Sequence, residues 1–436
     1  MDAFFREWER RAPGETRDIG RARALATVLD VLSPDVPVLT VVGSKGKGTA
    51  ATYASAYLAA SGLRVCTVTS PELRSNRERI RVDGRAVSEE ELAFLGSVLD
   101  EALGALPPPA GGYLSPSGLF TIAGVVHARN VGADAIVLEA GMGGRSDEIS
   151  LFPPAVVAIT PIFREHAGVL GDTPAEIAEE KLGVAGPTTA VLSAPQSAEV
   201  TGVLGDVERV EAGGSGLAED LLPGGLVRGS AELGVVAARR LPGVTEPPDG
   251  TLCDVLASVV LPGRLSWHDV PSSSPHPPPF NGRAPLDEPS SSPHPPPFNG
   301  RAPLDEPGSA TRLLVDSAVD GTGIAAALTA ARRVWGAIDR VVVCLPDHKD
   351  LDGAVAALDG LPVTFVRLPL PHLRFTRPLP SGWDVVGSDA VTPASLAALG
   401  RRVVVLGTVY FTGLVLDAVG ADTERLFVTA ASRRPS

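Results

Sequence analysis

Residues 38–62 read VLTVVGSKGKGTAATYASAYLAASG, and this stretch decides the fold class. Its first five residues are apolar or β-branched and predict a buried strand, whereas the alanine-rich run after Gly48 predicts a helix. Between the two, residues 43–49 contain three glycines and two lysines. Glycines let backbone N–H groups surround phosphate oxygens, a helix N-terminus adds partial positive charge, and a lysine can reach the outer phosphates. The stretch therefore predicts a strand, a phosphate-binding loop and a helix.

The loop departs from the strict P-loop spacing, because Gly48 stands between Lys47 and Thr49. A mobile turn with solvated lysines is the alternative that the loop alone leaves open. Glu139 supports the phosphate site, since it ends the apolar run of DAIVLEAGMGGRSD at residues 134–147. Parallel strands end at one edge of a sheet, where Mg²⁺ for a triphosphate would need oxygen ligands. A buried glutamate paired with an arginine is the alternative reading of Glu139.

The same alternation of apolar runs and helical patterns extends along the chain and predicts an α/β fold. Residues 1–268 are expected to form a P-loop-containing domain with a mostly parallel sheet, and residues 310–436 a smaller, Rossmann-like α/β domain. Between them, SSSPHPPPFNGRAPLDEP at residues 272–289 is repeated unchanged at residues 290–307. This composition predicts a disordered or polyproline II linker over residues 269–309, with docking into an aromatic groove as the alternative.

Composition narrows the classes of protein. The net charge of −13 does not favour a nucleic-acid or anionic-membrane surface. No signal-peptide pattern opens the chain and no window approaches 18 uninterrupted apolar residues, so a cytoplasmic protein is expected. Cys66, Cys253 and Cys344 are too widely spaced for a disulfide framework or a zinc site, and they are interpreted as buried or incidental thiols.

Six motifs in order then give the chain a resemblance to a known family. The sequence is similar to the folylpolyglutamate synthase and dihydrofolate synthase family of the Mur ligase superfamily. The motifs are GSKGKGT (43–49), TSPELRSNRERIRVDG (69–84), EAGMGGRSD (139–147), ITPIFREHAGVLGDTPAEIAEEKLG (159–183), LPGRL (261–265) and HKD (348–350).

The resemblance implies an ATP-dependent ligase that joins a carboxylic acid to an amine through an acyl phosphate. In such an enzyme Arg264 would approach the γ-phosphate and Asp316 would contact the nucleotide, while Lys47, His166, Lys181 and Arg264 would be catalytic. The phosphates would be held by Gly43, Ser44, Lys45, Gly46, Lys47, Gly48 and Thr49.

The resemblance also implies a metal site. Ser70, Glu139 and His166 would bind Mg²⁺, and Lys181 would hold a second ion as a carbamate. An unmodified lysine would be repelled by Mg²⁺, whereas a carbamate supplies oxygen ligands. A satisfied histidine and a solvated helix lysine are the alternatives for His166 and Lys181.

Several motifs depart from the family pattern, chiefly around base and substrate recognition. Glu72 follows Pro71 where the family has histidine, and Glu165 precedes His166 in place of aspartate. Residues 316–321 read DSAVDG instead of Asp-Gly-Ala-His-Asn-Pro. LVRGS at residues 226–230 replaces the His-Gln-x-x-Asn segment, and Ser117-Gly118 replaces Phe-Glu. A site that loses its hydrogen-bonding groups for a substrate usually loses that substrate. The acid that this protein uses is therefore expected to be either a folate precursor or a different carboxylic acid.

The leading hypothesis is an ATP-dependent ligase that adds L-glutamate or another amino acid to a small-molecule carboxylic acid, with ATP and Mg²⁺ as cofactors. A specialised-pathway ligase with a non-folate acid and a non-catalytic nucleotide-binding relative are the alternatives, and a P-loop kinase is a third. Because members of the family are commonly monomers, a monomer is expected.

Overall fold

The computed structural model describes residues 2–166, 168–270, 311–370 and 373–429. The chain forms two compact units, one of residues 1–259 with the segment from Thr423, the other of residues 260–422. The predicted domain boundaries differ from this division in two places. Residues 260–269 belong to the small unit, because Ser266–Asp269 pairs with its sheet. Residues 423–429 return to the large unit. The predicted linker lies, apart from Asp269 and Val270, outside the described residues.

The large unit is built on an eight-stranded sheet with the order β10-β9-β8-β2-β7-β3-β4-β5. Its centre is β2 (Val38–Val42), which pairs in parallel with β7 (Ala135–Glu139) and β8 (Val156–Ile159). Every residue of these strands is buried, which explains their continuous apolar runs. The remaining strands are β3 (Val65–Val68), β9 (Ala190–Ser193), β10 (Glu208–Arg209) and the antiparallel β4 (Ile80–Val82) and β5 (Arg85–Ala86).

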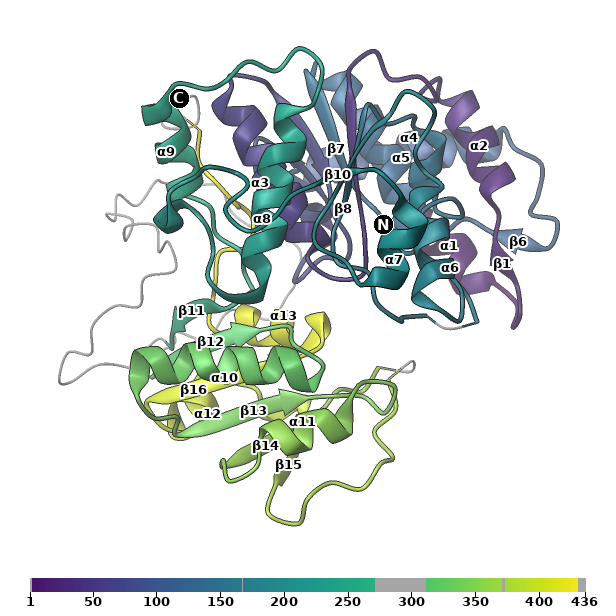
Figure 1. Ribbon diagram of the computed structural model, residues 1–436. Helices are drawn as coiled ribbons and strands as arrows, with labels where there is room; N and C mark the ends of the chain where they lie inside the picture. Colours follow the sequence, from purple (N-terminus) through teal and green to yellow (C-terminus); the bar gives the residue numbers. More distant parts are fainter. Residues whose placement is uncertain (1, 167, 271–310, 371–372, 430–436) are drawn as a thin grey trace, which may run out of the picture. The chain divides into compact units, whose positions relative to one another are not determined.

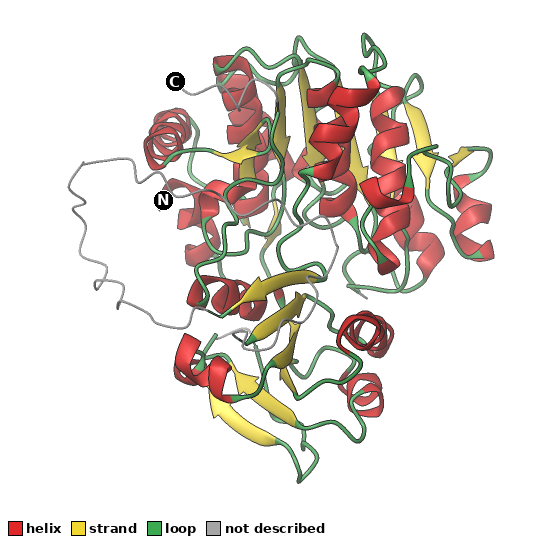
Figure 2. Ribbon diagram, turned by 90° about the vertical axis from the view of Figure 1, so that its left-hand side faces the viewer, coloured by secondary structure: helices red, strands yellow, loops and turns green. Residues whose placement is uncertain are grey.

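Helices lie on both sides of this sheet (Figures 1 and 2), as expected for a mostly parallel sheet. One group contains α3 (Lys47–Ala60), α8 (Arg228–Arg239) and α9 (Asp249–Ala257), with α8 and α9 both packed on α3. A second group contains α1 (Asp2–Arg10), α2 (Ile19–Val28), α4 (Glu89–Gly104) and α5 (Pro116–Asn130). The unit also contains α6 (Pro174–Leu182), α7 (Ala198–Leu204), the paired short strands β1 (Thr16–Arg17) and β6 (Gly112–Tyr113), and the 3-10 turns η1 (Asn76–Arg79), η2 (Glu148–Leu151), η3 (Glu219–Leu221) and η4 (Gly225–Val227).

The small unit has a six-stranded sheet with the order β11-β12-β16-β13-β14-β15, in which only β11 runs antiparallel. Trp267 and Trp335 meet edge to face in its core, with ring centroids 4.9 Å apart. The predicted α/β class is thus confirmed for both units. The elements are β11 (Ser266–Asp269), β12 (Arg312–Asp316), α10 (Gly321–Trp335), β13 (Arg340–Cys344), α11 (Leu351–Ala357), β14 (Val363–Arg367), β15 (Asp384–Gly387), η5 (Ser388–Ala390), α12 (Pro393–Ala398), β16 (Arg402–Gly407) and α13 (Val409–Ala418).

Within the described residues, no helix has the length and apolarity needed to cross a membrane.

The close approach of α8 to α3 requires a glycine. A Cβ atom on Gly234 would lie 2.2 Å from the carbonyl oxygen of Ala50, whereas a Cβ on Gly229 of the same helix would meet nothing within 4 Å. We expect Gly234→Ala to lower the free energy of unfolding by about 1–3 kcal/mol, because the two helix backbones must separate. Gly229→Ala should leave stability unchanged or raise it by up to about 1 kcal/mol, because alanine favours a helix. Urea denaturation of the two variants distinguishes this from a general intolerance of α8, which would destabilise both.

Candidate functional site

The loop between β2 and α3 has the backbone of an anion-binding turn. Gly43 and Gly46 have φ values of +137° and +85°, which side-chain-bearing residues rarely adopt. Neither position has room for a side chain, since an added Cβ would lie 2.0 Å from Thr160 Oγ1 and 2.1 Å from Ser230 Oγ, respectively. Gly46 is also the N-cap of α3, and no side chain caps the first turn. The N–H groups at the start of α3 are therefore suited to bind an anion.

Two lysines meet at the carbonyl oxygen of Gly43. Lys47 Nζ, from the first residue of α3, donates to it at 3.0 Å, and Lys181 Nζ, from α6, donates at 2.8 Å. Lys181 is only 1% exposed and forms an ion pair with Glu165 Oε1 at 2.9 Å. The alternative that Lys181 is a solvated helix lysine is therefore wrong.

Burial and the nearby charges shift the pKa values of this ion pair. Burial of Lys181, and next the charge of Lys47, lower the pKa of the Lys181 ammonium group, although Glu165 opposes them. Burial acts to raise the pKa of Glu165, but the charges of Lys181 and Lys47, together with hydrogen bonds from Lys181 and Ser44, lower the pKa overall. A neutral amine is therefore more accessible at Lys181 than at an ordinary lysine.

Ser44 connects the phosphate loop to the loop that carries Glu165. Its hydroxyl donates to the carbonyl oxygen of Phe163 at 3.2 Å and accepts from the Phe163 N–H at 3.2 Å. Lys45 is exposed, and its ammonium group lies 5.6 Å from the centre of the Phe163 ring. These contacts hold the loop after β8 against the phosphate loop.

Oxygen ligands gather on the other side of the loop, at the carboxyl end of β7. Glu139 is 7% exposed, and its Oε2 accepts the backbone N–H of Ser70 at 3.1 Å. A Cβ on Gly48 would lie 3.5 Å from the same oxygen, so Glu139 adjoins the start of α3. Thr49 Oγ1 is buried without a hydrogen-bond partner in the described structure. A carboxylate, a serine and an unsatisfied hydroxyl fit a hard cation such as Mg²⁺.

The remaining predicted metal ligand, His166, lies in the exposed loop after β8 with a φ of +48°. Its carbonyl oxygen accepts from the N–H groups of Val169 and Leu170. In the part of the chain that the structure describes, no group of three or more His, Cys, Asp or Glu side chains could hold a metal ion. Ser70 and Glu139 thus lie beside one another near the start of α3, and metal binding by these two residues and by His166 stays a prediction.

The predicted residues of the small unit also lie beside one another. Asp316 ends β12, and its Oδ2 accepts the N–H of Leu265, the residue after Arg264, at 2.8 Å. The Arg264 guanidinium group donates to the carbonyl oxygen of Gly263 at 3.2 Å. Asp350 of the HKD motif accepts the N–H of Gly321 at 3.0 Å, which connects this motif to the loop after Asp316.

A buried polar cluster near α5 was not predicted from the sequence. Glu148 Oε1 accepts from Ser115 Oγ at 2.6 Å, and Arg17 lies 3.6 Å from Glu148 Oε2. Burial, followed by the charge of Asp147, raises the pKa of Glu148. A Cβ on Gly118 would lie 2.1 Å from the Glu148 carboxyl carbon, so this carboxyl group fills the space of a side chain at residue 118. The signal in the sequence was the acidic pair directly after the glycine-rich turn.

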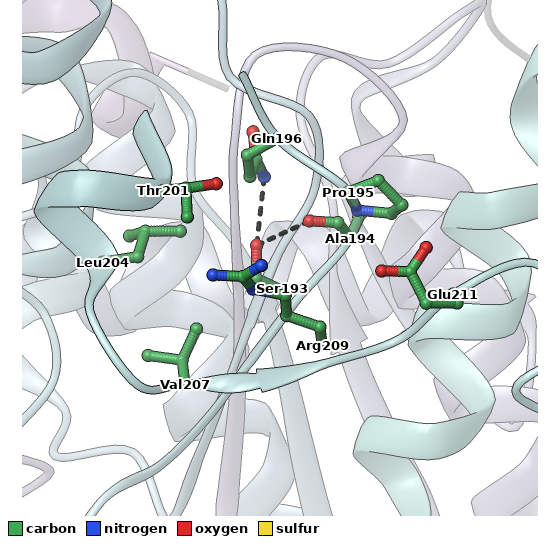
Figure 3. A pocket seen from close by; sticks show the side chains of 9 residues that line it. All are labelled: Ser193, Ala194, Pro195, Gln196, Thr201, Leu204, Val207, Arg209 and Glu211. Atoms are coloured by element: carbon green, nitrogen blue, oxygen red, sulfur yellow. Dashed lines mark hydrogen bonds between the residues drawn. The ribbon is translucent and has the colours of Figure 1, made fainter. Parts of the chain in front are cut away.

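A small cavity of about 90 Å³ lies beside the carboxyl end of β9. Figure 3 shows Gln196 and Ser193 pointing toward one another at its rim, and the amide Nε2 donates to Ser193 Oγ at 3.1 Å. The same nitrogen donates to the carbonyl oxygen of Thr160, the residue that closes the space at Gly43. Gln196 thus hydrogen-bonds to the residue that packs against Gly43 of the phosphate loop. None of the predicted site residues lines this cavity.

The chain forms a two-unit α/β protein with a glycine-rich loop between the central strand and the helix that follows it. A folylpolyglutamate synthase from Thermotoga maritima has a TM-score of 0.71 at 17% identity, over 94% of each chain. The Mycobacterium tuberculosis folylpolyglutamate synthase complexed with ADP and AMPPCP has a TM-score of 0.69 at 21% identity, over 93% of this chain and 96% of that one. At such identities the likeness shows the fold.

The sequence comparison gives the same names over a shorter stretch. The chain is 39% identical over 183 residues to a probable bifunctional folylpolyglutamate synthase/dihydropteroate synthase from Haloferax volcanii, which is 41% of this chain and 20% of that protein. It is 30% identical over 167 residues to the dihydrofolate synthase/folylpolyglutamate synthase of Bacillus subtilis, which is 38% of this chain and 39% of that protein. No protein-family model matches the chain. The match spans less than half of either relative's length. The resemblance inferred from the motifs is confirmed, because both relatives carry the name folylpolyglutamate synthase.

The unpaired hydroxyl of Thr49 gives a test of ligand binding. Thr49→Val keeps the shape and removes an unsatisfied buried polar group, so the unliganded protein should be as stable or more stable by about 1 kcal/mol. Binding of AMPPCP with Mg²⁺ should weaken at least about tenfold, because a charge-assisted contact is lost. Binding in EDTA should change little. The control is Thr52→Val on the same helix, which removes a satisfied bond to the Gly48 carbonyl oxygen and should cost about 1 kcal/mol of stability.

The buried pair of Lys181 and Glu165 predicts coupled stabilities. Lys181→Met should destabilise the protein by about 3–5 kcal/mol, because Glu165 is left without its partner. The double variant with Glu165→Gln should lose less than the sum of the two single variants. Urea denaturation in bicarbonate-free buffer measures both effects, and strict additivity would contradict the pairing.

The pH dependence of this stability has a defined sign. The folded-state pKa of Lys181 lies below the ordinary value of 10.5, so the unfolded chain binds the proton more readily between the two values. The contribution of Lys181 to stability therefore rises as the pH approaches 10.5. The stability difference between the native protein and Lys181→Met should grow from pH ~7 to ~10.

Proposed function

We propose that the protein is an ATP-dependent ligase that forms an amide between a small-molecule carboxylic acid and an amino acid. One observation carries the proposal: Lys47 and Lys181 converge on the Gly43 carbonyl oxygen at the uncapped start of α3. The ammonium group of Lys47 and the uncapped N–H groups at the start of α3 would supply positive charge where a polyphosphate would lie, and the buried Lys181 amine lies beside them. The names of the relatives and their complexes with ADP and AMPPCP support the same reading.

In the proposed reaction a carboxylate oxygen of the acid attacks the γ-phosphorus of ATP and ADP leaves. The amine nitrogen then attacks the acyl carbon, phosphate leaves, and the amine loses a proton. The N–H groups of residues 43–49 and Lys47 would orient the phosphates, and Arg264 and Asp316 are proposed as further nucleotide-binding residues. Mg²⁺, held by Ser70, Glu139, Thr49 and His166, would supply charge stabilisation at the phosphates.

Lys181 is suited to modification by CO₂. The ammonium group must lose a proton before its nitrogen can attack the carbon of CO₂, and burial lowers its pKa. The attack forms an N–C bond while one C–O π bond opens to an oxyanion, and the nitrogen then releases a second proton to solvent. The product, a carbamate, would exchange the positive charge beside Lys47 for a negative one and provide oxygen ligands for a second ion.

L-glutamate is the proposed amino acid. The proposed acid is either a pteroate or a different, non-folate carboxylic acid that binds at the same place. The second choice is favoured by Glu148, which fills the space beside Gly118 where relatives of this kind carry a glutamate. We also propose that the protein is a monomer, that it acts in the cytoplasm, and that its substrates are small molecules.

The deciding experiment measures ADP release from Mg²⁺–ATP with dihydropteroate plus L-glutamate and with each compound alone. We expect release that requires an acid and an amine together. Lys47→Met should reduce the rate at least about a hundredfold, because the transferred phosphate loses its lysine. Glu179→Gln, at an exposed position of α6, should have no effect. Rapid release without any amine would favour a kinase or a hydrolase, and no release with any acid tested would favour the non-catalytic alternative.

A further inference from the structure

Residues 423–429 return to the large unit and lie next to β5. Residues 423–427, here called the return segment, pair with β5 through backbone bonds from Ala86 N–H to the Glu424 carbonyl oxygen (2.8 Å) and from Leu426 N–H to the Gly84 carbonyl oxygen (2.9 Å). Phe427 is 2% exposed and covers Gly84, where an added Cβ would lie 2.8 Å from the ring. The segment is therefore packed against the unit rather than loose.

Two buried charged residues of the large unit are satisfied by this segment. Arg81 is 4% exposed and donates to the carbonyl oxygens of Thr423 (2.8 Å) and Glu424 (2.6 Å). Glu78 is 3% exposed, and its Oε1 accepts from Thr423 Oγ1 at 2.7 Å. Arg77 also pairs with the Glu424 carboxylate. Loss of such partners leaves buried charge uncompensated, which is costly.

Glu78 in turn holds the loop that leads away from Ser70. Its carboxylate accepts the backbone N–H groups of Leu73 (3.1 Å), Arg74 (3.3 Å) and Ser75 (3.2 Å). The next residue, Arg79, donates to Ser70 Oγ at 3.3 Å. The same guanidinium group pairs with Glu72 Oε2 at 2.5 Å. One carboxylate thus joins the return segment to the loop that carries the predicted magnesium ligand Ser70.

We propose that Thr423 is a positioning residue, and that the return segment holds the loop of residues 70–79 in the form in which Ser70 meets Glu139. The packing of Phe427 and the β5 pairing alone would serve to attach the end of the chain. The hydrogen bond from Thr423 to Glu78 adds a connection to the loop, because the Glu78 carboxylate is shared by Thr423 and the three loop N–H groups. The magnesium part of this inference rests on the proposed function, but the effect on the loop does not.

The test measures amide hydrogen exchange in the full-length protein without ligands. In Thr423→Val, which keeps the shape and removes the donor, the amides of Leu73, Arg74 and Ser75 should exchange about tenfold faster. Amides of β2 should be unchanged. Thr423→Ser should restore protection, because it restores the hydroxyl. The matched control is Arg425→Gln in the same segment, whose side chain takes no part in the contacts with Glu78 or Arg81.

The outcomes separate positioning from general stability and from the ligase proposal. Unchanged exchange at the three loop amides in Thr423→Val would overturn the inference, and so would an equal increase at β2. As a second readout, AMPPCP binding with Mg²⁺ should weaken about threefold to tenfold in Thr423→Val, and binding in EDTA should stay the same. Faster loop exchange with unchanged binding would keep the loop contact but contradict its link to the metal site. The exchange result holds whether or not any acid supports ADP release.

Discussion

The carbonyl oxygen of Gly43 is the point on which the candidate site depends. It accepts hydrogen bonds from Lys47 and Lys181, which come from two different helices. Gly43 has a positive φ and lies so close to Thr160 that no side chain fits at this position. Two ammonium groups so close repel one another, and Glu165 offsets part of that repulsion. The cluster keeps a local excess of positive charge in a protein whose net charge is −13. Such a local excess favours a bound anion without making the surface generally attractive to polyanions.

The site is assembled at the carboxyl edge of the sheet because three parallel strands end there. β2 leads into the phosphate loop, β7 ends at Glu139, and β8 leads to the loop of Glu165 and His166. Ser70 follows β3, the neighbour of β7, and reaches Glu139 through its backbone N–H. Strand order therefore brings together residues that are up to 138 positions apart in sequence, and parallel pairing sets which ends meet.

Sequence reasoning was most reliable where local pattern and topology agreed, as in the β2 strand, its glycine loop and α3. The sequence alone did not decide whether Lys181 is buried or solvated, although Lys181 lies four residues after buried Ile177 and so shares its face of α6. It placed the end of the chain in the small domain, because nothing local marks Thr423 as a partner of Glu78, which is 345 residues away. It also could not foresee that Glu148 occupies the space beside Gly118, because that contact depends on how α5 packs against η2.

The candidate site and the region beside Gly118 differ in how their buried polar groups are satisfied. Lys181 and Glu165 are buried charges, and such pairs are often less stabilising than apolar residues of similar size. Thr49 keeps a buried hydroxyl that no group in the described structure satisfies. A chain with no anion or cation to bind here would be more stable with apolar side chains at these positions. Beside Gly118, by contrast, the space is filled by Glu148, whose carboxylate is paired with Ser115 and Arg17. The loop between β2 and α3 thus keeps buried polar groups that a bound ion would stabilise, whereas Glu148 beside Gly118 already has partners within the protein.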